Sequence, residues 1–184
     1  MDANNNPWQI LTEKEIYDNP WINVKEFDVI NPGGGKGIYG KVHFKNLAIG
    51  IIALNEHNQI ALIGQYRFPI EQYSWEIPEG GGLHGIDPLL SAQRELQEET
   101  GLLANNWEKI MEMHLSNSVS DELAIVYLAT SLQQQQASPE ESEALELKWV
   151  ALDEAFQWVM QNKITDAISV AAILKLKILQ LGLN

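Results

Sequence analysis

Alternating apolar and polar residues divide the first part of the chain into short strands. The pattern predicts strands at Trp21–Ile30 and Ile38–Asn46, joined by a glycine-rich turn into an N-terminal hairpin. Leu47–Leu54 and Ile60–Gln65 are apolar runs of strand length, and the short polar segment between them predicts a second hairpin. This part of the chain is therefore expected to be mainly β-structure.

Strand and helix patterns follow one another in the second half. Strands are predicted at Trp107–Leu115, Leu123–Thr130 and Leu145–Val150, with a polar loop at Ser131–Ser142 that contains four consecutive glutamines. Two helices with apolar faces are predicted at the end of the chain. They are Asp153–Gln161 and Asp166–Leu181. The second helix is expected to place six apolar side chains in the core: Ile168, Ala171, Ala172, Leu174, Ile178 and Leu179.

The stretch Trp75–Leu102 reads as a short strand, a glycine-rich loop and a helix with defined ends. Asp87 suits the N-cap and Pro88 the first helical position, whereas Gly101 suits the residue that ends a helix. The apolar residues of this helix lie on one side, so we expect the helix to dock on the core. They are Leu89, Ala92 and Leu96.

Three carboxylates of this helix, Glu95, Glu98 and Glu99, share one face because they are spaced i, i+3, i+4. A solvated acidic face is the commoner reason for such a charge run. Here, however, the helix is short and docked, and Arg94 stands beside the carboxylates, where it can orient them. Fixed carboxylate oxygens suit Mg²⁺ or Mn²⁺, which water and a substrate phosphate complete. The helix therefore predicts a divalent metal site.

The same stretch resembles the signature of the Nudix hydrolases, G-x5-E-x7-R-E-U-x-E-E-x-G-U, where U is a bulky aliphatic residue. Gly80 begins the pattern. Residues 94–102 match its second half, R-E-U-x-E-E-x-G-U, with Gly101 as the second fixed glycine. One fixed position departs, because Ile86 stands where the motif has its first Glu. In the family that Glu mainly braces the loop and helix, so the departure concerns the bracing more than the metal site.

The resemblance implies a set of site residues. Mg²⁺, with Mn²⁺ as the alternative, would be held by the three helix carboxylates and by a main-chain carbonyl at Glu79 or Gly80. Arg67, in a Q-Y-R pattern at a strand end, corresponds to an arginine that contacts the diphosphate in ADP-ribose pyrophosphatase-like members. Glu122 corresponds to a substrate contact in related sugar-nucleotide enzymes, although a plain polar turn would also explain it.

The polar loop before Leu145–Val150 resembles a loop that supplies a catalytic base and a further metal ligand in ADP-ribose pyrophosphatases. Carried over by position, Glu141 is the base and Glu143 the ligand, and Glu95 is a further candidate base. An acidic loop of this kind is otherwise simply solvated.

Composition narrows the choice of partners. The formal net charge is −13, with 12 Lys and Arg against 25 Asp and Glu, so we expect no binding to nucleic acid. The chain has no cysteine, which excludes disulfides and thiol nucleophiles. We also expect no membrane span, since no apolar run approaches about 18–20 residues, and no signal peptide, which makes the cytoplasm the expected location.

Together these observations predict an α/β fold, which the resemblance specifies as the Nudix α/β/α sandwich around a mixed sheet. We expect an N-terminal antiparallel β subdomain at residues 1–46, which resemblance links to homodimer formation, and a hydrolase domain at residues 47–184. The implied reaction is metal-dependent hydrolysis of the diphosphate bond of a nucleoside diphosphate sugar, with ADP-ribose as the leading substrate. GDP-mannose, another sugar nucleotide or a dinucleotide is an alternative substrate, and a non-catalytic sensing module is an alternative function.

Overall fold

The structure is a computed structural model of the 184-residue chain, and it describes residues 5–135 and 145–182. The chain separates into two compact units. The first consists of residues 1–46 and 116–122, and the second of residues 47–115 and 123–184.

The first unit is built on an antiparallel sheet of three strands in the order β1-β2-β3. The strands are β1 (Gln9–Asp18), β2 (Ile22–Ile30) and β3 (Lys36–Phe44), of which the last two form the predicted hairpin. Strand β1 was not predicted, because all ten of its residues are exposed and its sequence lacks the apolar alternation of a half-buried strand. Residues 116–122 join this unit through a bridge between Val42 and Ser120.

The second unit holds two sheets. The four-stranded sheet has the order β7-β4-β9-β8 and is mixed, because β4 runs parallel to β9 whereas β8 is antiparallel to it. The three-stranded sheet is antiparallel, in the order β10-β5-β6. The strands of the first sheet are β4 (Asn46–Ala53), β7 (Glu79–Leu83), β8 (Leu102–His114) and β9 (Leu123–Gln134). Those of the second are β5 (Gln59–Arg67), β6 (Gln72–Glu76) and β10 (Glu146–Ala151).

The second predicted hairpin is wrong, although both of its strands exist. Strands β4 and β5 belong to different sheets, and an isolated bridge between Leu54, just after β4, and Ile60 closes the turn between them. The reason lies in burial: most of both strands is buried, and β4 pairs in parallel with β9, so it occupies the interior of its sheet rather than an edge beside β5.

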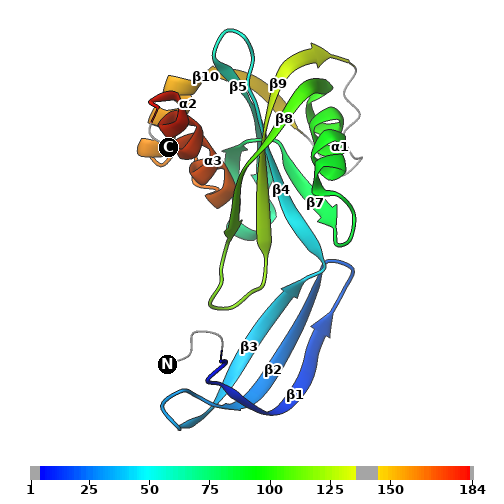
Figure 1. The fold of residues 1–184 in the computed structure, drawn as a ribbon, viewed down its shortest axis with the longest axis vertical. Coiled ribbons are helices and arrows are strands. Elements are labelled where there is room, and N and C mark those ends of the chain that lie inside the picture. Colours follow the sequence, from blue (N-terminus) through cyan, green and yellow to red (C-terminus); the bar gives the residue numbers. More distant parts are fainter. Residues whose placement is uncertain (1–4, 136–144, 183–184) are drawn as a thin grey trace. The chain divides into compact units, whose positions relative to one another are not determined.

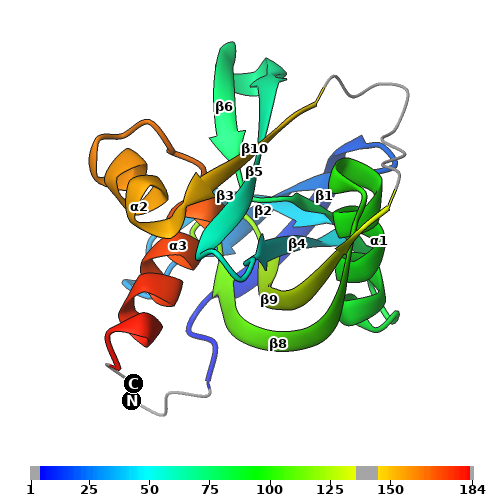
Figure 2. The ribbon, with the colours of Figure 1, turned by 90° about the horizontal axis from the view of Figure 1, so that it is seen from above.

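Helices cover the second unit from two sides, as Figures 1 and 2 show. Helix α1 (Pro88–Thr100) lies on one side, whereas α2 (Leu152–Met160) and α3 (Ala167–Gln180) lie on the other. Alternate residues of β4 serve the two sides: Ile49 and Ile51 pack with the α1 cluster, and Ile52 packs with the cluster of α2 and α3. This arrangement is the predicted α/β/α sandwich.

The ends of α1 are as predicted from the sequence. The Asp87 side chain accepts a hydrogen bond from the backbone N–H of Leu89 at 3.0 Å, and Pro88 is the first helical residue. Gly101 ends the helix in the left-handed conformation, with φ of 69°, which explains why glycine stands there. Two of the three predicted core residues of α1, Ala92 and Leu96, are fully buried.

Other local predictions need correction. The glycine-rich loop is largely the strand β7, which pairs in the four-stranded sheet beside α1. Strand β9 continues to Gln134, into the predicted polar loop, because it pairs with β8 over that length. In α3, Ile178 is 45% exposed, whereas Ile173 and Leu176, which were not in the predicted core, are buried. No helix in residues 5–135 and 145–182 is long and apolar enough to cross a membrane.

Candidate active site

The carboxylate face of α1 is held against strand β7. Glu95 and Glu99 are buried, with 9% and 7% of their surface exposed, and the side chain of Glu98 is 31% exposed. The helix can bury two carboxylates because Ala92 and Leu96, which adjoin them on the same side of the helix, are anchored in the core. The i, i+3, i+4 spacing therefore produces a fixed acidic face rather than a fully solvated one.

The backbone at the start of β7 contacts this face directly. A carboxylate oxygen of Glu99, Oε2, accepts a hydrogen bond from the backbone N–H of Glu79 at 3.0 Å. A Cβ atom placed on Gly80 would lie 2.1 Å from the carboxyl carbon of Glu95, far inside contact distance. The close approach explains the need for glycine at position 80. It brings the predicted main-chain ligands and the helix carboxylates into one place.

Arg94 offsets part of the charge on this face and ties the helix to the loop. Its Nη1 donates to Glu98 at 2.6 Å, and its Nη2 donates to Glu95 at 2.5 Å and to the Gly81 carbonyl at 2.9 Å. Burial acts to lower the pKa of Arg94, but the charges of Glu95 and Glu98 outweigh it, so the pKa is raised. Arg94 was predicted to orient the carboxylates, and it contacts two of them.

Ile86, which replaces the first motif Glu, lies at the surface with 49% of its area exposed. It therefore does not replace the missing carboxylate with core packing. In this chain the contact between Arg94 and the Gly81 carbonyl links the helix to the segment before it. The bracing expected from the motif Glu is at least partly supplied in that way.

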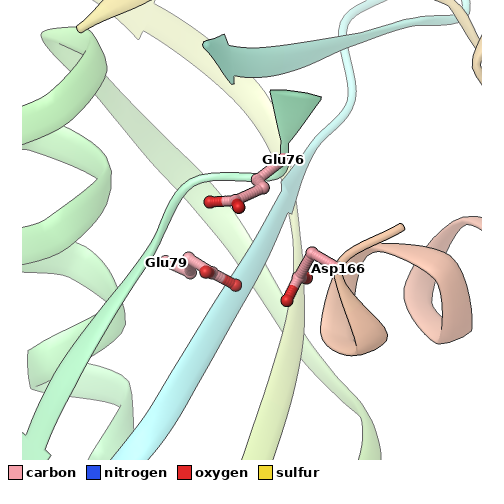
Figure 3. A group of neighbouring side chains, drawn as sticks. All are labelled: Glu76, Glu79 and Asp166. Atoms are coloured by element: carbon pink, nitrogen blue, oxygen red, sulfur yellow. The ribbon is translucent and has the colours of Figure 1, made fainter. Parts of the chain in front are cut away.

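Figure 3 shows a second group of carboxylates, which includes the side chain of Glu79 and is linked to the first group through the backbone of Glu79. Ligand oxygens of Glu76, Glu79 and Asp166 lie within 4.8 Å of one another. Asp166 is the N-cap of α3 and accepts from the backbone N–H of Ser169 at 2.7 Å. The hydroxyl of Ser169 in turn accepts from the backbone N–H of Ile77 at 2.9 Å, which fixes the start of α3 against the segment after β6.

Arg67 is the cation of this second group. Its Nε donates to both oxygens of Glu76, at 3.1 and 2.9 Å, and its Nη2 donates to Glu76 Oε2 at 2.5 Å. The same Nη2 also reaches Glu79 Oε1 at 2.5 Å. Burial acts to lower the pKa of Arg67, but its hydrogen bond to Glu76 and the charge of Glu79 raise the pKa above its ordinary value. The guanidinium therefore stays charged.

Glu79 shows that the region carries more negative charge than its arginines offset. Burial raises the pKa of Glu79 well above its ordinary value, and the charges of Asp166 and Glu76 add to this effect. Within residues 5–135 and 145–182, its Oε2 atom is buried without a hydrogen-bond partner. An excess of fixed carboxylate oxygens is the donor set that a hard divalent cation takes. The carboxylates around Glu79, from this group and from the adjoining face of α1, therefore fit such an ion.

The structure does not test three of the predicted site residues. Glu122 belongs to the first unit, so its predicted substrate contact stays a prediction. Glu141 and Glu143 lie outside the described residues, and their predicted roles as base and ligand are untested.

Glu76 and Asp166 were not singled out from the sequence, yet the structure places both beside Arg67 and Glu79. Glu76 left a signal: it is a charged residue in a strand, W-E-I-P, whose neighbours are apolar. Asp166 was assigned only to the start of a helix, and nothing local to it indicates a second role. Its neighbours in the cluster are some 90 positions away in the sequence, so only the tertiary fold reveals them.

Comparison with known families agrees with the fold and the carboxylate helix. The family model of the NUDIX domain matches residues 44–170, and the chain belongs to this family. A second family model, the nucleoside diphosphate sugar hydrolase N-terminal domain, matches residues 8–42. The chain is thus a Nudix pyrophosphohydrolase with the N-terminal strands of a subgroup. Enzymes of this family generally require a divalent metal ion.

Individual proteins resemble this chain over most of its length. The methanol dehydrogenase activator of Bacillus methanolicus is 35% identical over 165 residues, which cover 89% of this chain and 89% of the relative. The ADP-ribose pyrophosphatase of Mycobacterium tuberculosis is 30% identical over 172 residues, covering 91% of this chain and 82% of the relative. The crystal structure of an ADP compounds hydrolase shares the fold, with a TM-score of 0.84 over 96% of this chain and 97% of that chain, at 19% identity.

Proposed function

We propose that this protein hydrolyses the diphosphate bond of a nucleoside diphosphate sugar, with ADP-ribose as its leading substrate, to a nucleoside monophosphate and a sugar phosphate. One observation carries the proposal: the carboxylate face of α1 and the guanidinium of Arg67 both contact the segment of residues 76–80. The carboxylate face of α1 contacts the backbone of Glu79 and Gly80, and Arg67 contacts the side chain of Glu79. The residues that we propose as metal ligands and the cation that we propose for the phosphates are thus both in contact with Glu79. Relatives that are ADP-ribose pyrophosphatases support the substrate class.

We assign Mg²⁺, or Mn²⁺ in its place, to the carboxylate face. Glu95, Glu98 and Glu99 would hold the ion together with a main-chain carbonyl at Glu79 or Gly80, and Glu143 would be a further ligand. When bound, the metal screens the diphosphate and lowers the pKa of its bound water.

Other residues of the chain bind substrate and move the proton. Arg67 donates to the phosphate oxygens and stabilises their negative charge as the bond breaks. Glu141 takes the proton of the attacking water, with Glu95 as the next candidate base, and Glu122 contacts the substrate. Arg94 and Gly101 keep the helix and its carboxylates in place.

The proposal is tested by a screen of sugar nucleotides and dinucleotides with Mg²⁺, in which released phosphomonoesters are measured. ADP-ribose is expected to give the highest kcat/KM, with GDP-mannose and other sugar nucleotides as the comparison. Glu98→Gln should lower the rate at least about 100-fold, because a lost ligand removes transition-state stabilisation. Tight binding of a sugar nucleotide without any release of phosphomonoester would instead establish a sensing module.

We further propose that residues 1–46 form a β subdomain that makes a homodimer, and that residues 47–184 form the hydrolase domain. Six large apolar side chains of this sheet and its turns are at least half exposed, which is typical of a surface that another protein covers. They are Ile10, Leu11, Ile16, Tyr17, Trp21 and Ile38. The charge of −13 supports the absence of nucleic-acid binding, and we propose a cytoplasmic location away from membranes.

A further inference from the structure

Strand pairing places Arg67 and Glu76 so that the two side chains can meet. In the β5–β6 pair, Arg67 lies opposite Gln72 and Ile63 lies opposite Glu76. Because side chains alternate across a sheet, Ile63 and Arg67 point to the same face of β5, and Glu76 points to that face from β6. Arg67 ends its strand and reaches back along this face to the carboxylate. The contact therefore joins two residues of rigid strands rather than two loop residues.

The two carboxylates that contact Arg67 differ in how firmly they hold it. Glu76 accepts from both Nε and Nη2, and only 4% of its side chain is exposed. Glu79 accepts from Nη2 alone, and its second oxygen has no hydrogen-bond partner among the residues that the structure describes. A two-nitrogen contact fixes the plane of the guanidinium, whereas a contact at one nitrogen does not. Glu76 is therefore the residue that sets the orientation of Arg67.

Arg67 also keeps donors for a ligand. Within the part of the chain that the structure describes, its hydrogen bonds use Nε and Nη2, so that Nη1 remains for another acceptor. The Arg67 side chain is 36% exposed although its partner Glu76 is buried. The guanidinium is thus anchored on one edge and accessible on another.

We propose that Glu76 is a positioning residue for the reaction: it holds the Arg67 guanidinium in the plane in which Nη1 can donate to a phosphate oxygen of the substrate. This inference rests on the proposed function, since it assigns Arg67 to the diphosphate. Without the Glu76 carboxylate, Arg67 would keep only its contact with Glu79, whose own charge competes with the substrate phosphates for the guanidinium. Preorganised donors of this kind act without reorganising during the reaction.

A double-mutant cycle tests whether Glu76 acts through Arg67. Glu76→Gln should lower kcat/KM for ADP-ribose by about 10- to 100-fold, since the guanidinium loses its charged two-point anchor. In an Arg67→Lys background the same substitution should cost less than about threefold, because an ammonium group cannot be held in a plane. Glu146→Gln is the matched control: this carboxylate lies in the same sheet, contacts Tyr73, and should leave kcat/KM unchanged. Equal losses from Glu76→Gln in both backgrounds would overturn the proposal.

A second measurement does not depend on hydrolysis. The chain has two arginines, Arg67 and Arg94, so 15N-arginine labelling gives two Nε–Hε signals, and Arg67→Lys assigns them. In the wild type, the Arg67 Nε–H should exchange slowly and its signal should shift on addition of ADP. Glu76→Gln should speed this exchange and weaken the ADP-induced shift, whereas Glu76→Asp, which keeps the charge, should restore part of both.

The two experiments separate the inference from the function on which it rests. If the wild type hydrolyses no sugar nucleotide or dinucleotide, the proposed function fails, whatever the arginine signals show. If the wild type hydrolyses ADP-ribose but Glu76→Gln leaves both kcat/KM and the Arg67 signal unchanged, only the positioning role fails. If Glu76→Gln does not fold, the cycle is run with Glu76→Asp, whose shorter side chain should still cost more with Arg67 present than with Lys at position 67.

Discussion

Gly80 illustrates how a single residue can be required for reasons of space alone. Gly80 is not one of the glycines with a positive φ, so its backbone conformation does not require glycine. A Cβ atom at this position would, however, overlap the Glu95 carboxylate. The sequence motif records the glycine, and the structure supplies the physical reason for it. A side chain at position 80 can be admitted only if the Glu95 carboxylate moves away from the backbone of β7.

Gly80→Ala is therefore expected to displace Glu95 and to lower kcat/KM by at least about 100-fold, since a shift of about 1 Å in an active site can cost that much. The half-saturating Mg²⁺ concentration should rise with it, and both are measured by steady-state kinetics over a metal titration. Gly40→Ala is the control, because a Cβ at position 40 has nothing within 4 Å. Normal kinetics for Gly80→Ala would show that the Glu95 carboxylate can move aside without loss.

Asp121 is a second residue whose environment leads to a measurable effect. It pairs with Lys41 and His43 at 2.8 Å each and accepts from the backbone N–H of Phe44 at 3.0 Å. Burial acts to raise its pKa, but the hydrogen bonds from Lys41 and His43 outweigh burial and lower the pKa of Asp121 to about 2. The unfolded value is about 3.9, so the native state favours the charged form.

The stabilisation that Asp121 provides should be complete above about pH 4 and lost as the pH falls toward 2, because protonation then removes it. Hydrogen exchange of the Phe44 amide, compared between the wild type and Asp121→Asn at each pH, isolates this carboxylate from the others. The ratio of the two exchange rates should be largest above about pH 4 and approach unity near pH 2. A ratio independent of pH over this range would contradict the assignment.

At the level of elements, the loop before α1 shows how this chain departs from its family motif. The motif Glu is replaced by the exposed Ile86, and Arg94 already contacts Glu95, Glu98 and the Gly81 carbonyl. Arg94, the partner expected for a carboxylate at position 86, thus already shares its charge with other acceptors. Because position 86 is half exposed, the added carboxylate would also not be buried among apolar side chains.

Ile86→Glu is therefore expected to change the melting temperature by less than about 2 °C, as for most surface substitutions. The half-saturating Mg²⁺ concentration should change less than about threefold. Leu83→Glu, at a 64% exposed position of the same segment, is the control for a negative charge added near the metal site. A several-fold gain in metal affinity with Ile86→Glu alone would mean that Arg94 does not supply the whole brace.

The same comparison shows which elements a sequence can specify. Helix α1 could be predicted with its ends, because Asp87, Pro88 and Gly101 act locally. Strand β1 could not, because strand pairing rather than a buried face holds it in place. The cluster of Glu76, Glu79 and Asp166 was missed for a different reason: α3 brings Asp166 to the strand segment only through tertiary packing. The motif was therefore sufficient to predict the carboxylates of α1, whereas only the structure reveals that Glu76 anchors Arg67.

At the scale of the whole molecule, the exposed apolar residues of the first unit are typical of a surface that another protein covers. Ile10 is opposite Val29 and Ile38 is opposite Asp28, and these are consecutive residues of β2. Ile10 and Ile38 therefore lie on opposite faces of the sheet, with 60% and 70% of their surface exposed. A monomer would leave an exposed isoleucine on each face in water. A homodimer can cover one of them.

The wild type is expected to sediment as a dimer, at about twice the 20.7 kDa of one chain, with a concentration-dependent mass. Ile10→Glu and Ile38→Glu are made separately, because a charge buried in an interface costs several kcal/mol and the variant that dissociates identifies the buried face. Met160→Glu, at a 61% exposed position on α2 in the second unit, should remain dimeric. A wild type that sediments at the mass of one chain at all concentrations would refute the dimer. If the wild type is dimeric and neither glutamate variant dissociates, another surface joins the subunits.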